Sequence, residues 1–484
     1  MQIQVRTEKM LVAGNWLEAG AMFDVINPQN NEVIAKVPKA TEKDMMRAIE
    51  KSEEAFRHLA SWPTHERIKV LQKAADYVAN DFDNFAETIA LEGSKTINEA
   101  RSEVTRTIQT LNISAEEVRR LKGETLNFDQ REGSENRTGY YYRFPIGIIA
   151  AITPFNDPLN LVAHKVGPAL AAGNPIIVKP ASATPLSALL LAKALDEAGV
   201  PKGFLSVVTG AGSDIGDTLI THPFVKMVSF TGGFEAGEKI AHKAGLKKVA
   251  MELGSNSPVI VLKDACLSDA VISTVSGAFS AAGQNCLGVQ RIFVEESVYK
   301  PFISAFVDRT KELTVGDKMS EWTDIGPLIN EKEAKRVETW IEEAVFEGAV
   351  IETGGIRERA YIQPTVLTQV SPQSTIYQEE VFGPVVMIEP VRHLKEAIKK
   401  ANDVNYGLQA GIFTKNMDHA FYAVHHLQSG AVMVNDSSDY RIDEMPFGGV
   451  KGSGLGREGV RYAIHDMTDP KVVCFKIDSM WGVS

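Results

Sequence analysis

The sequence contains little cysteine, no long apolar run and no excess of positive charge. Its 484 residues include three Cys, too few for a disulfide framework, so we expect a reducing compartment. No uninterrupted run of about 18 apolar residues occurs, so no membrane-spanning helix is predicted. The net charge of −11 disfavours nucleic acid and anionic membranes as partners, although local basic patches remain possible.

The size and composition are those of a multidomain globular protein. Hydrophobic residues make up 44% of the chain, which is enough for large cores. This length predicts two or more domains, with no internal repeat or low-complexity linker to mark their boundaries. The first residues, Met1–Arg6, do not have the charged-then-apolar pattern of a secretion signal, so we expect a cytoplasmic protein.

The first third of the chain changes from strands to helices and then to an exposed ribbon. Short strands are predicted at Phe23–Asn27 and Glu32–Val37. Thr41 has the position of a helix N-cap, with acidic residues in the first turn, and helical periodicity continues to about Leu121. Residues 122–143 are polar, contain glycine and end in aromatic residues, a pattern typical of an exposed ribbon.

Beyond residue 145, short apolar runs alternate with helical segments. The first run is Ile146–Ile152, and a second series begins at Pro258–Leu262 and continues to about residue 435. This alternation predicts an α/β fold in which helices cover both faces of parallel sheets. Lys471–Lys476 predicts a strand that belongs to neither series.

One thiol and one carboxylate stand out as candidate catalytic groups. Cys286 is flanked by polar and turn-permissive residues, whereas Cys266 and Cys474 lie in ordinary element-like stretches. A thiolate attacks a carbonyl carbon, and a carboxylate such as Glu252 can then activate water to hydrolyse the resulting thioester. Taken alone, Cys286 is better interpreted as a buried small side chain, since free Cys is among the most buried residue types, and Glu252 as a solvated charge.

Three segments suggest a dinucleotide site. Gly210–Gly216 follows a strand and opens a helix, but its last spacing is one residue longer than in GxGxxG, so a plain glycine turn is an equally good interpretation. Phe230–Gly233 also ends a strand and begins a helix, whose N–H groups could hold a pyrophosphate. Lys179 ends a third strand, a usual place for a ribose-binding cation in an open α/β sheet.

Seven short segments stand in the order typical of one known family. They are Thr153–Asn156, Lys179–Ser182, Phe230–Gly233, Met251–Gly254, Gly283–Cys286, Glu379–Pro384 and Pro446–Gly449. With them, the chain resembles the aldehyde dehydrogenase superfamily along nearly its whole length. Each segment is modestly specific, and their common order makes coincidence a poor explanation.

The resemblance implies the aldehyde dehydrogenase fold, with three parts. We expect a Rossmann-like NAD(P)-binding domain at 1–121 and 144–253 and an α/β catalytic domain at 254–435. A β-ribbon oligomerisation element would combine 122–143 and 455–484. The protein would then be a homodimer or a homotetramer.

The resemblance also implies the catalytic roles. Cys286 would attack the aldehyde to form a thiohemiacetal, and the Asn156 amide and the Cys286 backbone N–H would form the oxyanion hole. A donor in such a hole contributes about 10²–10³ in rate. Hydride transfer to the nicotinamide would give a thioester, and Glu252 would activate the water that hydrolyses it. Without the family context, Asn156 could be a turn residue.

NAD or NADP is the implied cofactor. The positions that would contact it are Thr153, Pro154, Phe155, Lys179, Ser182, Gly212, Thr231, Gly232, Gly233, Leu253, Glu380 and Phe382. Lys179 would bind the adenosine ribose and Glu380 the nicotinamide ribose, with Phe382 near the ring. Glu380 could otherwise be a solvated acid, and Phe382 plain core.

Two positions depart from the usual family pattern. Ser182 stands where many NAD-preferring relatives have Glu, which removes a charge that would repel a 2′-phosphate and makes NADP use plausible. Ser255 replaces a more usual Gly, with no firm consequence from the sequence.

Two arginines suggest an anionic substrate. Arg106 and Arg441 occupy positions where relatives that act on anionic aldehydes carry arginine. Without an acid between them, two guanidiniums would repel one another unless they shared an anion. Each could instead pair with an acid close in sequence, Glu103 for Arg106 and Asp439 or Asp443 for Arg441.

Asn285, beside the predicted nucleophile, replaces a third arginine found in some of these relatives and is a further candidate substrate residue. The imaginable substrates are lactaldehyde, sulfolactaldehyde, phosphonoacetaldehyde, glyceraldehyde 3-phosphate and succinic semialdehyde. A CoA-acylating semialdehyde dehydrogenase is an alternative, but Glu252 would be superfluous there. A non-catalytic binding protein is another, disfavoured because Cys286, Glu252 and Asn156 are all present. No metal site is predicted.

Overall fold

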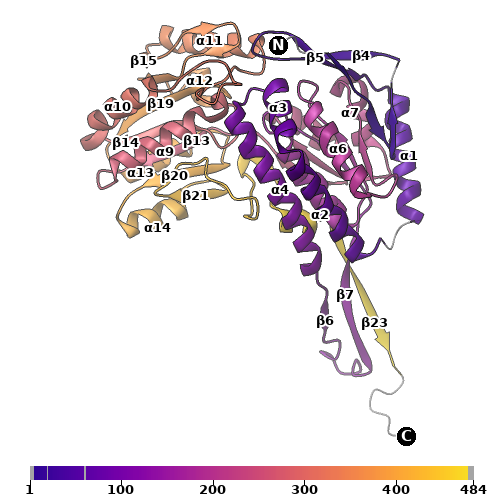
Figure 1. The fold of residues 1–484 in the computed structure, drawn as a ribbon. Coiled ribbons are helices and arrows are strands. Elements are labelled where there is room, and N and C mark those ends of the chain that lie inside the picture. The colour runs from indigo at the N-terminus through magenta and orange to yellow at the C-terminus, as the bar shows by residue number, and fades with distance from the viewer. Residues whose placement is uncertain (1–4, 19, 59–61, 478–484) are drawn as a thin grey trace.

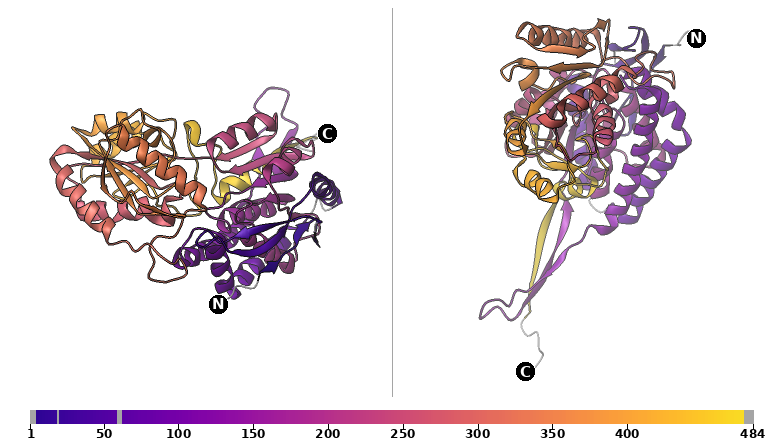
Figure 2. Two further views of the ribbon diagram at one scale, coloured as in Figure 1. Left: turned by 90° about the horizontal axis from the view of Figure 1, so that it is seen from above. Right: turned by 90° about the vertical axis from the view of Figure 1, so that its left-hand side faces the viewer.

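The computed structural model describes residues 5–18, 20–58 and 62–477. Two α/β lobes lie side by side, and a ribbon of antiparallel strands projects from the lobe that contains the N-terminal helices (Figure 1). Figure 2 shows the same two lobes from above and the ribbon extending well beyond them. The fold is a mixed α/β arrangement of largely parallel sheets, as the sequence predicts.

The first lobe is built on a sheet whose strand order is β22-β12-β11-β8-β9-β10-β2-β3. Its parallel strands are β8 (Ile148–Ile152), β9 (Ile176–Lys179), β10 (Leu205–Val207), β11 (Val225–Thr231) and β12 (Lys248–Glu252), with β2 (Met10–Val12), β3 (Asn15–Leu17) and β22 (Gly454–Leu455) antiparallel at the edges. A small separate sheet joins β1 (Arg6–Thr7), β5 (Val33–Pro38) and β4 (Met22–Ile26).

Helices cover both faces of this sheet. They are α1 (Glu42–His58), α2 (Thr64–Asn80), α3 (Phe82–Glu92), α4 (Ile97–Arg120), α5 (Asn160–Ala172), α6 (Leu186–Ala198), α7 (Gly212–Thr221) and α8 (Phe234–Ala244). Alternate residues of β8 face two different cores: Ile149 and Ala151 pack with α2, α5 and α6, and Ile148 and Ala150 with α1 and α7. Because both faces are buried, the central strands are mainly apolar and do not alternate regularly with polar residues.

The second lobe repeats this arrangement on a sheet of order β15-β18-β19-β14-β13-β20-β21. The strands are β13 (Ser257–Val261), β14 (Val289–Glu295), β15 (Val350–Thr353), β18 (Thr365–Thr368), β19 (Val385–Val391), β20 (Gln409–Phe413) and β21 (Ala431–Val434). The helices are α9 (Leu267–Phe279), α10 (Glu296–Lys311), α11 (Glu331–Phe346), α12 (Thr375–Gln378), α13 (Leu394–Ala401) and α14 (Met417–His426). A hairpin of β16 (Arg357–Glu358) and β17 (Tyr361–Ile362) lies outside this sheet. The predicted α/β series to about residue 435 is confirmed.

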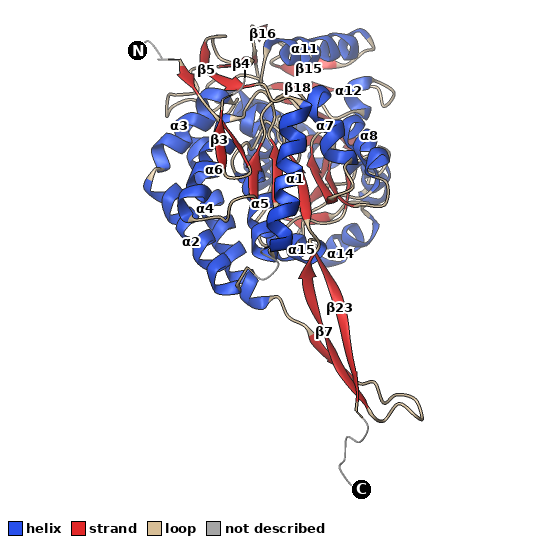
Figure 3. Ribbon diagram, turned by 90° about the vertical axis from the view of Figure 1, so that its right-hand side faces the viewer, coloured by secondary structure: helices blue, strands red, loops and turns tan. Residues whose placement is uncertain are grey.

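The ribbon joins segments that are far apart in the sequence. β7 (Arg137–Pro145) pairs antiparallel with both β6 (Glu124–Leu126) and β23 (Thr468–Lys476), and Figure 3 shows β7 and β23 projecting from the body. The predictions of an exposed ribbon near 122–143 and of a detached strand at Lys471–Lys476 are confirmed. So is the N-cap at Thr41, whose hydroxyl accepts a hydrogen bond from the Asp44 N–H at 3.4 Å.

The predicted C-terminal part of the ribbon, 455–484, begins too early. β22 pairs with β12 in the first sheet, and α15 (Val460–Asp466) packs on α4 and α5. The reason is that Val460 and Ile464 form an apolar stripe that is buried in the core of the first lobe. The ribbon strand therefore begins at Thr468, and residues 478–484 lie outside the described residues, as do residues 1–4 of the first predicted domain.

In the part of the chain that the structure describes, no helix is both long and apolar enough to cross a membrane.

Candidate active site

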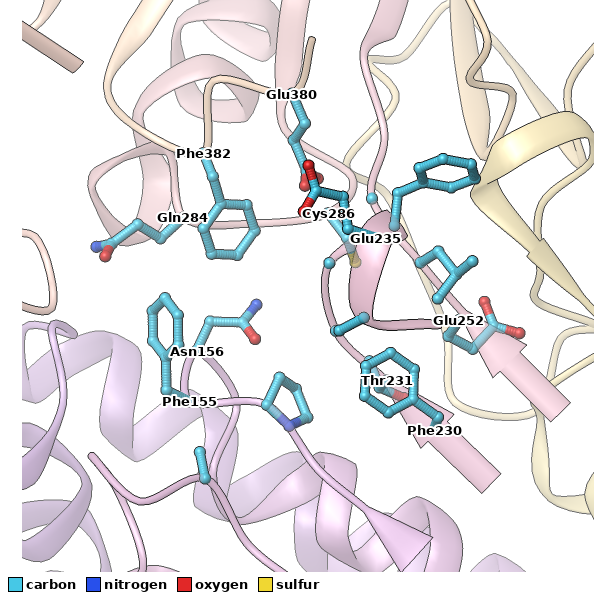
Figure 4. Close-up of a pocket in the computed structure, with 18 of the residues that line it drawn as sticks. Phe155, Asn156, Phe230, Thr231, Glu235, Glu252, Gln284, Cys286, Glu380 and Phe382 are labelled. Atoms are coloured by element: carbon cyan, nitrogen blue, oxygen red, sulfur yellow. The ribbon is translucent and has the colours of Figure 1, made fainter. Parts of the chain in front are cut away.

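A pocket of about 800 Å³ lies where the carboxyl ends of β8, β11 and β12 face loops of the second lobe (Figure 4). In parallel α/β sheets this edge is the usual ligand-binding position. Of the predicted site residues, the pocket is lined by Thr153, Pro154, Phe155, Asn156, Thr231, Gly232, Gly233, Glu252, Leu253, Cys286, Glu380 and Phe382. The fold thus brings together catalytic and cofactor candidates from both lobes.

The loop that carries Cys286 has an unusual backbone. After α9, a short 3-10 turn at Ser280–Gly283 places Ala281 and Ala282 at φ 53° and Gly283 at φ 69°. A Cβ on Gly283 would lie 2.1 Å from the carbonyl oxygen of Gly383. Only glycine fits this close approach between the nucleophile loop and the loop that carries Phe382.

Burial raises the pKa of the Cys286 thiol to about 12, since the positive charge of Arg441 only partly offsets desolvation. The nearby carboxyl groups of Glu380 and Glu252 raise it further. The thiol is therefore protonated at neutral pH when no ligand is present. To act as a nucleophile it must transfer its proton to a base.

Glu252 is the last residue of β12 and is almost completely buried. Burial, followed by the negative charge of Glu458, raises the pKa of its carboxyl group well above the usual range. Within the described structure neither carboxyl oxygen has a hydrogen-bond partner. Figure 4 shows the carboxyl group turned away from the Cys286 sulfur. A buried carboxylate of this kind has a high proton affinity and suits general-base chemistry.

Behind Glu252 lies a buried ionic cluster that the sequence reasoning missed. The Glu458 carboxylate contacts Lys165 Nζ at 2.9 Å and Arg441 Nη2 at 3.5 Å. Although burial opposes ionisation, Lys165 and Arg441 hold the pKa of Glu458 at about 2. The signal available in the sequence was Lys165, a charged residue inside the mostly apolar α5.

Asn156 follows β8 on a loop of the first lobe. In Figure 4 its side-chain amide points into the pocket, toward the side where Cys286 lies. The neighbouring Asp157 is ion-paired with Lys95 and approached by Arg106 at 3.4 Å. The loop that carries Asn156, the predicted oxyanion donor, is thus fixed by the charged contacts of the adjacent Asp157.

Lys179, Ser182 and Gly212 lie together at the end of β9 and the start of α7. Lys179 Nζ donates to the Pro180 carbonyl at 2.9 Å and to the Gly210 carbonyl at 3.3 Å, and the Ser182 hydroxyl donates to Gly210 at 3.0 Å. Burial lowers the pKa of Lys179 to about 8. These side chains form one polar cluster beside Ala181, which lines the pocket.

The α8 N-terminus also faces the pocket, through Gly232 and Gly233. There is open space where a Cβ of Gly233 would lie, and the N–H groups of an eleven-residue helix begin there. This is the geometry in which helix N-termini bind phosphate groups, so the residues present fit a dinucleotide.

The second lobe supplies Glu380 and Phe382. Burial raises the pKa of Glu380 to about 7, and its Oε1 accepts the backbone N–H of Ser255 at 2.8 Å. Phe382 adopts φ 48°, a strained value for an aromatic residue, and its ring meets Phe155 edge-on at 5.7 Å. Ser255, where the family more usually has Gly, thus contacts Glu380 through its backbone N–H. Its buried hydroxyl forms a hydrogen bond with the hydroxyl of Ser257 at 2.9 Å.

Three residues of α11 also line the pocket and were not predicted. Arg336 donates to Glu333 at 2.7 Å and to the Val381 carbonyl at 2.8 Å, and its guanidinium lies 4.5 Å from the centre of the Trp340 ring. Their sequence signal is only an ordinary amphipathic helix, so they could not be found without the fold.

Both candidate substrate arginines have acidic partners, which corrects the expectation of guanidiniums without acids. Arg106 Nη2 contacts Asp443 at 2.8 Å, not Glu103, and Arg441 contacts Glu458, not an acid close in sequence. Both partners became adjacent only through folding. Neither arginine is among the residues that line the pocket described above.

The Asn285 side-chain oxygen accepts the Leu287 N–H at 3.1 Å, which stabilises the turn after the predicted nucleophile. Its predicted substrate contact stays a prediction.

Comparison with known proteins connects this site to a family. Residues 16–473 match the model of the aldehyde dehydrogenase family. The 3-sulfolactaldehyde dehydrogenase of Priestia aryabhattai is 45% identical over 474 residues, covering 98% of this chain and 99% of that one.

Two solved structures are also similar. Aldehyde dehydrogenase 21 from Physcomitrella patens, in complex with the reaction product succinate, is 40% identical with a TM-score of 0.96, covering 99% of this chain and 100% of that one. Glyceraldehyde-3-phosphate dehydrogenase GapN from Methanocaldococcus jannaschii, complexed with NADP, is 40% identical with a TM-score of 0.91, covering 95% of this chain and 100% of that one.

Proposed function

The chain belongs to the aldehyde dehydrogenase family and is an NAD(P)-dependent aldehyde dehydrogenase, and on this basis we propose that it oxidises a short anionic aldehyde to the carboxylate. The observation that carries the proposal is the Arg441 guanidinium, a buried cation whose hydrogen-bonding capacity is largely unused. It is near enough to Cys286 to lower the pKa of that thiol.

Arg441 has five N–H donors, and its one ion pair in the described structure is the 3.5 Å contact with Glu458. Its Nε is buried without a hydrogen-bond partner, and its side chain is 7% exposed. The guanidinium is stacked on Phe447, 3.8 Å from the ring centre, which fixes its plane. A planar cation held in this way suits bidentate recognition of a carboxylate, sulfonate or phosphate.

Arg106 is the second proposed anion contact, but its charge is already shared with Asp443 and Asp157. We therefore assign Arg441 the larger share of anion binding. The names of similar proteins agree with this chemistry, since sulfolactaldehyde carries a sulfonate, glyceraldehyde 3-phosphate a phosphate and succinate carboxylates.

We propose Cys286 as the nucleophile. Its thiol gives up its proton to a base and adds to the aldehyde carbon, and the Asn156 amide and the Cys286 N–H donate to the resulting oxyanion. NAD or NADP, when bound, accepts the hydride that leaves this carbon. The cofactor would be held by Lys179, Ser182 and the α8 N-terminus at its adenosine and phosphate end. Glu380 and Phe382 would hold the nicotinamide end.

Glu252 then takes a proton from the water that attacks the thioester, and the Cys286 thiolate leaves. For this step the Glu252 side chain must turn from its present position toward the pocket. Its raised pKa supports the role, because a carboxylate with a high proton affinity is the stronger base. Glu458, held as a carboxylate by Lys165, stabilises the protonated form of Glu252 that results.

We also propose the domain roles. The first lobe would bind the cofactor; it comprises residues 1–121 and 144–253 and the added segment 454–467. The second lobe, residues 254–435, would complete the catalytic site. The ribbon would mediate formation of a homodimer or homotetramer, since Tyr142, Val472 and Phe475 on it are about half exposed. Light scattering of the full chain tests the oligomeric state.

The substrate proposal is tested by kcat/KM for acidic and neutral aldehydes of similar length. Succinic semialdehyde, glyceraldehyde 3-phosphate and sulfolactaldehyde would be compared with propionaldehyde, each with NAD and with NADP. We expect at least one acidic aldehyde to exceed propionaldehyde by about tenfold or more, the value of one charge-assisted hydrogen bond. A preference for the neutral aldehyde would contradict the proposal.

A further inference from the structure

The turn between α3 and α4, together with the first turn of α4, contacts both loops that carry the proposed oxyanion donors. Glu99 on α4 reaches the backbone of the nucleophile loop, and Lys95 reaches the acid beside Asn156. We propose that Lys95 and Glu99 are positioning residues that hold the Cys286 loop of one lobe and the Asn156 loop of the other in register for the reaction. The proposal rests on the roles of Cys286 and Asn156 proposed above.

Glu99 fixes the part of the nucleophile loop that is least favourable on its own. Its Oε1 accepts the Ala281 N–H at 2.6 Å, and its Oε2 accepts the Thr96 N–H at 2.9 Å in a capping box. Ala281 and Ala282 are both left-handed, a conformation that L-residues with a Cβ avoid. A short hydrogen bond at the first of them offsets this strain where the chain turns toward Cys286.

A second contact links the same turn to the nucleophile loop. The Ser94 hydroxyl donates to Gln284 Oε1 at 3.4 Å, and that oxygen also accepts the Ile329 N–H at 2.9 Å. Gln284 is buried and stands two residues before Cys286. The nucleophile loop is thus held at Ala281, where its left-handed segment begins, and at Gln284, directly after that segment ends.

Lys95 fixes the other loop. Its Nζ is ion-paired with Asp157, next to Asn156, and with Glu103 at 2.8 Å. Glu103 in turn accepts the N–H groups of Leu159 and Asn160 at 2.8 Å and 3.0 Å. The Asn156 loop and the start of α5 are therefore both tied to Lys95.

The common origin of these contacts matters because the two oxyanion donors come from different lobes. Their separation is set by packing between lobes, and both contacts come from the N-terminus of α4, with Lys95 just before the N-cap Thr96 and Glu99 in the first turn. A displacement of about 1 Å in a reacting group can cost about 10²-fold in rate. Loosening either contact should slow attack on the aldehyde without weakening the distant adenosine end of the cofactor site.

The test is the first turnover of Glu99→Ala, followed by stopped-flow with saturating aldehyde and cofactor. We expect the rate constant for formation of reduced cofactor to fall about ten- to a hundredfold, with the cofactor Kd within about twofold of the wild type. The stoichiometry of Cys286 alkylation by iodoacetamide, read by mass spectrometry, counts intact sites and should be unchanged. Glu99→Gln should recover most of the rate, because its amide oxygen can still accept the Ala281 N–H.

Two controls separate positioning from general damage. Thr96→Ala removes the hydroxyl that caps α4 and donates to Glu99 Oε2 at 3.2 Å, but it leaves the Glu99–Ala281 hydrogen bond, so it should lower Tm and change the first-turnover rate constant far less than Glu99→Ala does. Glu87→Ala, an exposed residue on α3, should change neither. Lys95→Met should slow the first turnover as Glu99→Ala does. A normal rate constant in either Lys95→Met or Glu99→Ala would overturn the proposal, as would an equal loss in Thr96→Ala.

The first turnover of Cys286→Ala distinguishes failure of the proposed mechanism from failure of the positioning proposal. If Cys286 were not the nucleophile, Cys286→Ala would still complete a first turnover. If the mechanism holds and the positioning proposal fails, Cys286→Ala is inactive while Glu99→Ala turns over at the wild-type rate.

Discussion

Replacing Arg441 by alanine should cost this enzyme its preference for acidic aldehydes. The side chain is 7% exposed, so solvent screens its charge little, and its Nε lacks a partner in the described structure. We expect kcat/KM for the preferred acidic aldehyde to fall by much more than kcat/KM for propionaldehyde.

The size of the effect follows from the contacts available. A charge-assisted hydrogen bond contributes about 1.5–3 kcal/mol, and each 1.4 kcal/mol corresponds to about tenfold in kcat/KM. Loss of the Arg441 contact therefore predicts a decrease of about ten- to a hundredfold for the acidic substrate. Arg441→Lys keeps a charge but loses the planar donor pair, so its loss should be smaller.

The assay is steady-state kinetics of both variants with an acidic and a neutral aldehyde. Arg461→Ala, which removes an exposed arginine of α15, is the matched control and should leave both values unchanged. Circular dichroism checks that Arg441→Ala is folded, because the change removes one of the two ion pairs of the buried Glu458 and leaves the pair with Lys165. Equal losses on the acidic and neutral aldehydes would show that Arg441 is structural and would refute the reasoning.

Cys286→Ala should abolish oxidation while cofactor binding, measured by fluorescence titration, survives; full turnover by this variant would disprove the thioester mechanism. Glu252→Gln should slow deacylation and leave a burst of reduced cofactor about equal to the enzyme, and a linear time course at the wild-type rate would exclude its role as base. Ser182→Glu should shift the ratio of kcat/KM values toward NAD, since a carboxylate beside a 2′-phosphate costs about 1 kcal/mol or more; an unchanged ratio would contradict this. Because burial raises the pKa of Cys286 to about 12, the thiolate fraction of the free enzyme grows as pH rises. Its alkylation by iodoacetamide should therefore accelerate up to at least pH 10 or so, and a plateau near neutral pH would show a preformed thiolate.

The order and type of elements could be read from the sequence because they depend on local periodicity. The alternation that begins at Ile146–Ile152 appears as strands and helices of two lobes, and Lys471–Lys476 is a separate ribbon strand as predicted. The boundary at 455 was wrong because the short apolar stripe of α15 does not reveal which surface it packs on. Burial of Val460 and Ile464 against α4 and α5 decides that, and it is a property of the assembled lobe.

For the site, too, part of the chemistry could be predicted from the sequence and part depends on the fold. Cys286, Glu252 and Asn156 could be proposed from the sequence, because each stands in a short segment whose residue types suit its role. Their electrostatic surroundings could not, because the contacts join residues that are 293 positions apart, as in Lys165–Glu458, or 337 apart, as in Arg106–Asp443.

The sequence alone determined the family and the NAD(P) cofactor class, and it was enough to propose the nucleophile, because all three depend on local segments in a fixed order. Only the tertiary structure decided which charges are neutralised, which buried donors, such as Arg441 Nε, lack a partner among the described residues, and that Glu99 reaches Ala281. The physical reason is that pKa shifts and hydrogen bonds depend on distances of a few ångströms between side chains, and packing of the two lobes sets those distances.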